Sequence, residues 1–247
     1  LHKFEIDMVF YQGKLVASRG KPLFPPPPVT LQLNNSVRIR PPTAKALKVP
    51  LLTQERLSED EESEETYPVI EIIPGQIVTK KVMEKVKMVD GTVMPDDERD
   101  ILKLVVVERH KASGNIGVGL VKGFGLKKGA LASSVAHDSH NIIAVGTNDL
   151  DILKAIEEIN RLQGGLVVCA NLEILAFLSL PIAGLLSPEP LDVVVFQYET
   201  VERAATSLGN LPPSPFFVIS FLALPVIPEL RLTDLGLVDV KEFRLIK

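Results

Sequence analysis

The sequence predicts a mixed α/β (α+β) protein in which a largely interior mixed β-sheet is flanked by helices. Three observations predict this fold class. The valine-rich apolar run at 101–107 is typical of an interior strand. Short β-like runs punctuated by glycine follow over 116–145, and residues 149–163 show helical periodicity. A β-hairpin near the N-terminus precedes this main part.

Composition limits the classes of protein to which the chain can belong. Its 247 residues are 46% hydrophobic and 23% charged, which indicates a globular chain with one large domain or two smaller ones. A net charge of -4 argues against broad nucleic-acid binding. The single cysteine, Cys169, excludes an internal disulfide. Proline interrupts the longest apolar runs. We therefore expect a cytoplasmic protein without nucleic-acid or membrane partners.

The N-terminal third is predicted to be irregular apart from one hairpin. Two β-rich runs flank Gly13, which supplies the positive φ that a tight turn requires. Proline dominates 21–28, and six carboxylates crowd 59–65, which predicts a solvated loop; docking of a basic partner is the functional alternative. The expected organisation is a hairpin region at 1–40, a proline-rich and acidic linker at 41–66, and a main domain at 67–247.

The first elements of the main domain are strands, and its clearest helix follows them. Residues 69–73 form a strand pattern that turns at 74–75 and resumes at 77–78. The helix at 149–163 has one apolar stripe, with Asn148 or Asp149 as a plausible N-cap. Gly164 stands where a left-handed C-terminal residue belongs.

The C-terminal third is predicted to hold a strand pair and one more helix. Runs at 166–169 and 174–177 indicate strands that pair around Asn171. A second helix is expected over 190–208, since Ser-Pro precedes it and a glycine follows it. The tail at 216–247 mixes apolar runs with prolines and turns.

The glycine-rich stretch at 114–119 invites interpretation as a phosphate loop. It lacks a Gly-Lys-Ser/Thr ending, and no helical pattern follows it. We therefore expect these glycines to permit bulges or a close approach between strands.

The densest polar cluster lies between two apolar runs at 133–141. Two of the four histidines, three residues apart, lie here beside an aspartate and three serines. Two imidazoles are too few for a closed metal site, and a serine nucleophile would need a positioned base. The simpler alternative is a polar loop that hydrogen-bonds its own turn. The candidate substrate-binding residues are Ser134, His137, Asp138, Ser139 and His140.

Two other reactive side-chain groups have structural interpretations. The trio at 108–110, Glu-Arg-His, follows the strongest strand and indicates an ion pair or a surface histidine. Cys169 lies within an apolar strand run and is interpreted as a small buried side chain.

Several long blocks of this sequence resemble the C-terminal domain of adenine deaminase, a metal-dependent amidohydrolase. They include the motif VAHDSHN, and the resemblance extends in collinear order from about residue 72 to residue 240. The N-terminal hairpin resembles the strand pair that joins the small β-sandwich of such enzymes. The blocks lie at 73–79, 101–110, 119–126, 132–141, 145–149, 180–185 and 220–228.

This resemblance implies a hydrolase of purine salvage that converts adenine and water to hypoxanthine and ammonia with Mn or Fe. The family's metal ligands, including a His-x-His, lie on an N-terminal barrel. This chain has no His-x-His and resembles only the last part of such an enzyme, so the catalytic barrel is expected to be absent. No metal ligand or catalytic residue is therefore assigned here, and the chain alone is expected to be inactive and to bind no cofactor. The segment at 137–141 is expected to face the barrel and help enclose the purine.

Three interpretations of the whole chain stay open. The leading one is the C-terminal portion of an adenine deaminase, as a fragment or one product of a divided gene. Its partners would be adenine, the barrel portion or a companion chain, and further copies in a homo-oligomer. The alternatives are a stand-alone, non-catalytic purine-binding or regulatory module and an inactive remnant.

Overall fold

Residues 5–25, 35–49, 62–89 and 92–246 are described by the computed structural model, and they divide into two units, Leu1–Gln32 and Leu33–Lys247. The first unit is a three-stranded antiparallel sheet of β1 (Met8–Tyr11), β2 (Lys14–Ser18) and β3 (Lys21–Pro22). Gln12 and Gly13, with φ of 48° and 76°, form the turn between β1 and β2, so the predicted hairpin is confirmed. A second sheet that would complete a sandwich is not among this unit's described residues.

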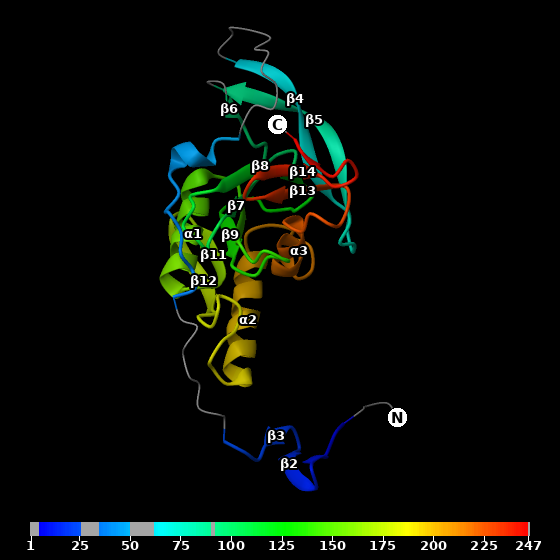
Figure 1. Cartoon of the computed structure of the whole chain (residues 1–247), viewed down its shortest axis with the longest axis vertical. Coiled ribbons are helices and arrows are strands. Elements are labelled where there is room, and N and C mark those ends of the chain that lie inside the picture. Colours follow the sequence, from blue (N-terminus) through cyan, green and yellow to red (C-terminus); the bar gives the residue numbers. More distant parts are fainter. Residues whose placement is uncertain (1–4, 26–34, 50–61, 90–91, 247) are drawn as a thin grey trace. The chain divides into compact units, whose positions relative to one another are not determined.

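The second unit is built on an open nine-stranded sheet (Figure 1). Its order is β12-β11-β9-β10-β7-β8-β4-β5-β6; β4 and β8 pair in parallel and the other neighbours are antiparallel. No closed barrel forms within the described residues. The strands are β4 (Glu62–Ile72), β5 (Thr79–Val89), β6 (Thr92–Val93), β7 (Ile101–Val107), β8 (Ile116–Lys122), β9 (Ala130–Ser133), β10 (Ile142–Gly146), β11 (Gly165–Ala170) and β12 (Glu173–Ser179).

Strand β7 lies at the centre of this sheet, and all seven of its residues are buried. The predicted interior strand is thus confirmed. Its one charged residue, Lys103, is accommodated because its ammonium group forms an ion pair with Asp149, the first residue of helix α1 (Asp149–Leu162). A buried charge needs such a partner, so this ion pair also fixes where α1 begins on the sheet.

Two layers cover the sheet. Helix α1 packs on β9, β10 and β11, and η1 (Ala44–Leu47), a short 3₁₀ helix, packs beside it. The other layer contains α2 (Leu191–Thr206), which packs on β11 and β12, and α3 (Pro215–Leu222), which packs on β9 and β10 (Figure 1). It also contains a small sheet of β13 (Leu230–Thr233), β14 (Gly236–Asp239) and β15 (Arg244–Leu245). No helix in the described part of the chain is both long and apolar enough to cross a bilayer.

The glycine-rich stretch brings β8 against the β13–β14 hairpin. A Cβ atom on Gly117 would lie 1.8 Å from the carbonyl oxygen of Thr233. A Cβ atom on Gly119 would lie 3.2 Å from a methyl group of Leu237. The prediction that these glycines permit a close approach between strands is confirmed, and no helix opens after them.

Several predicted boundaries were wrong. Glu62–Glu65 lie in β4 and not in a solvated loop, because they pair with Val86–Val89 of β5; residues 59–61 lie outside the described residues. Strand β5 begins at Thr79 and not at Ile77. The left-handed end of α1 is Gln163, at φ 60°, one residue before the predicted glycine. The domain boundaries at 40 and 66 stay predictions.

Helix α3 was not predicted. Eight mostly apolar residues, PFFVISFL, show no polar face, so their periodicity gives no helical signal. The Ser214-Pro215 pair at its start is the one local signal that could have identified it, since proline is favoured at the first helical position. The other two predicted helices are confirmed, with α2 ending at Thr206 instead of residue 208.

Replacing Gly117 with alanine is expected to destabilise the fold by about 3 kcal/mol, because the new methyl group would overlap backbone that cannot move independently. Urea unfolding followed by circular dichroism measures this change. Gly119→Ala is the matched control: it meets a flexible leucine methyl group and should cost about 1 kcal/mol or less. Equal stability of the two variants would contradict the close approach at Gly117.

Candidate functional site

The predicted polar segment connects β9 to β10 at one end of the sheet. We call residues 134–141 the β9–β10 loop. Three backbone hydrogen bonds hold it: the amide of Ser134 donates to Gly165 at 3.0 Å, that of His137 to Ser220 of α3 at 2.9 Å, and that of His140 to Ala136 at 2.6 Å. Two of these bonds come from segments that are distant in sequence, and the third closes a turn within the loop.

Ser134 lies at the base of this loop and is buried. Its hydroxyl donates to the carbonyl of Gly184 at 2.6 Å and accepts from the amide of Gly165 at 2.8 Å. Both hydrogen-bonding roles of the hydroxyl are thus occupied by backbone. Ser134 anchors the loop to the 180–185 segment, and its role in contacting a substrate stays a prediction.

His137 and His140 lie side by side next to α3. Their ring centroids are 5.9 Å apart in an edge-on arrangement. The ring of His137 also lies 4.6 Å from that of Phe221, which itself contacts Phe217 at 4.8 Å. The structure therefore brings the two predicted histidines together and adds two aromatic rings that sequence analysis missed. Asp138 and Ser139 are exposed at the tip of the loop.

Arg109 lies beneath the loop and is 1% exposed. Its Nε donates to the carbonyl of His140, and Nη2 donates to the carbonyl of Ala183 at 3.1 Å. Gly184 makes room for it, because a Cβ there would lie 2.7 Å from Nη1. The predicted ion pair for this trio was wrong as regards Arg109: the guanidinium binds backbone carbonyls and joins the β9–β10 loop to the 180–185 segment.

The charges around His140 favour its neutral form. Burial, together with the charges of His137 and Arg109, lowers the pKa of His140 below its ordinary value. Its Nδ1 is buried and has no hydrogen-bond partner within the described residues. A neutral imidazole carries one hydrogen-bond donor and one acceptor.

Glu108 organises the turn that follows β7. Its carboxylate accepts from the amides of His110, Lys111 and Ser113 at 2.5–3.0 Å and from the Ser113 hydroxyl at 2.9 Å. Burial raises the pKa of this carboxyl, but the four hydrogen bonds outweigh that effect and lower the pKa to about 2.

Two contacts extend from this turn and from the loop. His110 is exposed, as predicted, and its Nε2 lies 2.7 Å from the Ser139 carbonyl oxygen. Asn141 accepts from the Arg109 amide at 3.4 Å and donates to Asp234, in the β13–β14 turn, at 3.1 Å. The β9–β10 loop is thus supported both by the turn that follows β7 and by the β13–β14 turn. Sequence analysis gave no role to Arg109 or Asp234 at this site.

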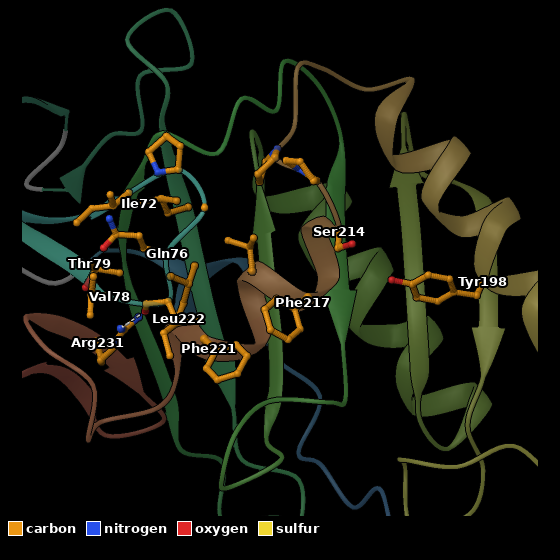
Figure 2. A pocket seen from close by; sticks show the side chains of 17 residues that line it. Ile72, Gln76, Val78, Thr79, Tyr198, Ser214, Phe217, Phe221, Leu222 and Arg231 are labelled. Atoms are coloured by element: carbon orange, nitrogen blue, oxygen red, sulfur yellow. Dashed lines mark hydrogen bonds between the residues drawn. The ribbon is translucent and has the colours of Figure 1, made fainter. Parts of the chain in front are cut away.

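A cavity of about 530 Å³ lies beside α3, and one of its lining side chains is Phe221, whose ring contacts that of His137 (Figure 2). Most of the side chains around it are apolar, and they come from the β4–β5 turn, from α2 and from α3 with its preceding loop. Figure 2 shows Phe217 and Phe221 side by side along α3, with Tyr198 of α2 pointing toward Ser214. Arg231 of β13 lines the cavity on the side of Val78 and Leu222.

Comparisons with known proteins identify relatives over the whole length of this chain. The family model described as the adenine deaminase C-terminal domain matches residues 76–244. An adenine deaminase of Dehalococcoides mccartyi strain CBDB1 is 50% identical over the whole chain. Proteins with the same name from Halalkalibacterium halodurans and Methanothrix thermoacetophila are 46% and 43% identical over 100% and 98% of it.

The chain belongs to the adenine deaminase family, in the C-terminal domain. The resemblance seen in the sequence is confirmed. The chain spans about 41% of the length of these three relatives.

The adenine deaminase resemblance implies a divalent metal, so we tested whether the described side chains fit one. Within 5–25, 35–49, 62–89 and 92–246, no group of three or more histidine, cysteine or acidic side chains is arranged to hold a metal ion. Cys169 is buried, and burial with the neighbouring Asp151 raises the pKa of its thiol to about 12, so the interpretation as a structural side chain is confirmed. The residues described here therefore do not fit the metal.

The hydrogen bonds of Glu108 predict a pH dependence of stability. The folded-state pKa of about 2 lies below the ordinary 4.5, so their stabilisation is complete above pH 4.5 and is lost as pH falls toward 2. Glu108→Gln should lower the free energy of unfolding at pH 7 by about 2 kcal/mol and flatten its decline in that window. Urea unfolding at a series of pH values measures this. The exposed variant Glu189→Gln is the control; an unchanged pH profile in Glu108→Gln would contradict the assignment.

Proposed function

We propose that this chain is the C-terminal part of an adenine deaminase whose complete form hydrolyses adenine to hypoxanthine and ammonia in purine salvage in the cytoplasm. The observation that carries this proposal is the family match over most of the chain, with collinear relatives more than twice its length. The metal, Mn or Fe, would be held by residues other than those described here, on the barrel that the resemblance implies.

An apolar surface supports a role as part of a larger assembly. The first half of α2 is largely exposed to solvent, and Leu191 and Phe196 on it are 79% and 66% exposed. Large apolar side chains exposed along one helix of a soluble protein mark a region of interaction. We propose that the barrel portion, a companion chain or another copy covers this region.

Within that assembly, the β9–β10 loop is proposed to contact the purine. His137 and Phe221 offer flat aromatic surfaces on which a planar base can stack. His140, which favours its neutral form, offers one donor and one acceptor to the ring nitrogens or the exocyclic group. The buried positive charge of Arg109 lies directly beneath and favours electron-rich atoms above it.

The first experiment separates the catalytic interpretation from a stand-alone purine-binding module. Ammonia release from adenine is measured for this chain with Mn or Fe, with and without a co-produced barrel portion from a relative such as that of Dehalococcoides mccartyi. We expect release only with both portions. Turnover by this chain alone would contradict the proposal that catalysis requires the barrel portion. Adenine binding without turnover in either case would favour the module.

The second experiment tests the loop. In the assembled enzyme, replacing both His137 and His140 with alanine should raise KM or lower kcat by about tenfold in total, because stacking and one hydrogen bond to the base together contribute about 1–2 kcal/mol. Steady-state kinetics measures both constants, and thermal unfolding verifies that the variant is folded. His2→Ala, outside the described residues, controls for histidine loss in general. Kinetics equal to those of the parent enzyme would remove the loop from the mechanism.

A further inference from the structure

The wall of the cavity beside α3 includes a buried arginine, Arg231, whose guanidinium has one hydrogen-bonding group without a partner among the described residues. Arg231 is completely buried, and three backbone carbonyls accept from its guanidinium: Ile227 from Nε at 2.7 Å, and Ile77 and Pro228 from Nη2 at 2.5 and 3.4 Å. Its Nη1 has no partner within the described residues. A guanidinium nitrogen of this kind carries two N–H donors, so one edge of the group is unsatisfied.

The charge of Arg231 is also uncompensated. No ion pair within the described residues includes it, whereas buried charges in proteins are normally paired. Burial lowers the pKa of Arg231 to about 10, so the group still carries its charge at neutral pH. Leaving such a charge unpaired in an apolar setting is unfavourable, and an anion that reached Nη1 would relieve that cost.

The rest of the cavity suits a flat, apolar molecule. Its volume of about 530 Å³ is within the usual range of small-ligand sites. Phe217, Val218 and Phe221 line it along α3, and Val78 lines it from the β4–β5 connection (Figure 2). The two phenylalanine rings are tilted by 59° to each other, so a planar ring can lie against either of them.

We propose that this cavity binds a small organic carboxylate with a flat apolar body, whose carboxylate pairs with Nη1 of Arg231 while its body lies against Phe217 and Phe221. A carboxylate carries one negative charge, which matches the single cation. A phosphate group carries more charge than one guanidinium edge can neutralise, and the apolar walls disfavour the remainder. This site goes beyond the proposed deaminase function and does not depend on it.

The site is also joined to the β9–β10 loop. Phe221 forms a wall of the cavity and packs against the ring of His137. Occupation of the cavity therefore changes the surroundings of an aromatic ring that His137 contacts directly. The bound carboxylate is expected to shift the His137 resonances as well as those of α3.

Titration of the isotope-labelled chain with benzoate tests the proposal, with benzamide as the neutral molecule of the same shape and acetate as the carboxylate without a ring. Benzoate should shift the amide signals of residues 217–222 saturably, and each control should bind about tenfold more weakly or less, since it lacks one of the two contacts. Equal affinity for benzoate and benzamide would overturn the role of Arg231. Absence of saturable shifts at α3 up to tens of millimolar benzoate would overturn the site.

Three single-residue variants test whether benzoate binds in this cavity. Phe217→Ala should weaken benzoate binding about fivefold by removing one apolar wall, whereas Phe196→Ala removes an exposed phenylalanine of α2 that does not line the cavity and should change nothing. Equal effects of the two variants would contradict binding in the cavity. Arg231→Gln, which removes the positive charge, should reduce benzoate affinity to that of benzamide. If its loss of three backbone contacts prevents folding, the benzoate–benzamide comparison and the Phe217 variant still decide the proposal.

Discussion

The candidate site depends on one buried guanidinium. Arg109 follows the central strand β7, and it binds the carbonyls of His140 and Ala183, which lie on two different loops. The absent side chain of Gly184 leaves space for it. Both contacts are to backbone, so they do not require particular side chains at His140 and Ala183.

This support determines what the loop can present to a ligand. The polar groups of Ser134 and Asn141 are hydrogen-bonded to neighbouring backbone and to Asp234. The ring of His137 lies against Phe221 and beside the ring of His140. The same arrangement lowers the pKa of His140, first by burial and then through the nearby charges of His137 and Arg109. Rigid anchors below and aromatic rings above are what a site for a planar, uncharged base requires.

Most of this fold could be predicted from the sequence because the strongest signals in the sequence were local. The fully buried run of β7, the capped helix α1 and the glycines facing the β13–β14 hairpin could each be predicted from short windows. Helix α3 could not, since an almost entirely apolar octet has no periodicity, and the acidic start of β4 was hidden by its charge. At the site, the polar loop was found by composition. The roles of Arg109, Phe221 and Asp234 depend on contacts between distant segments, which no short window contains.

These contacts between distant segments also mean that the loop is synthesised before the residues that support it. The amide of His137 is held by Ser220, and the side chain of Asn141 is held by Asp234, 93 residues further along the chain. During translation, the strands on either side of the loop leave the ribosome well before these two supports exist. The loop therefore lacks these two supports until residues 220 and 234 have been synthesised.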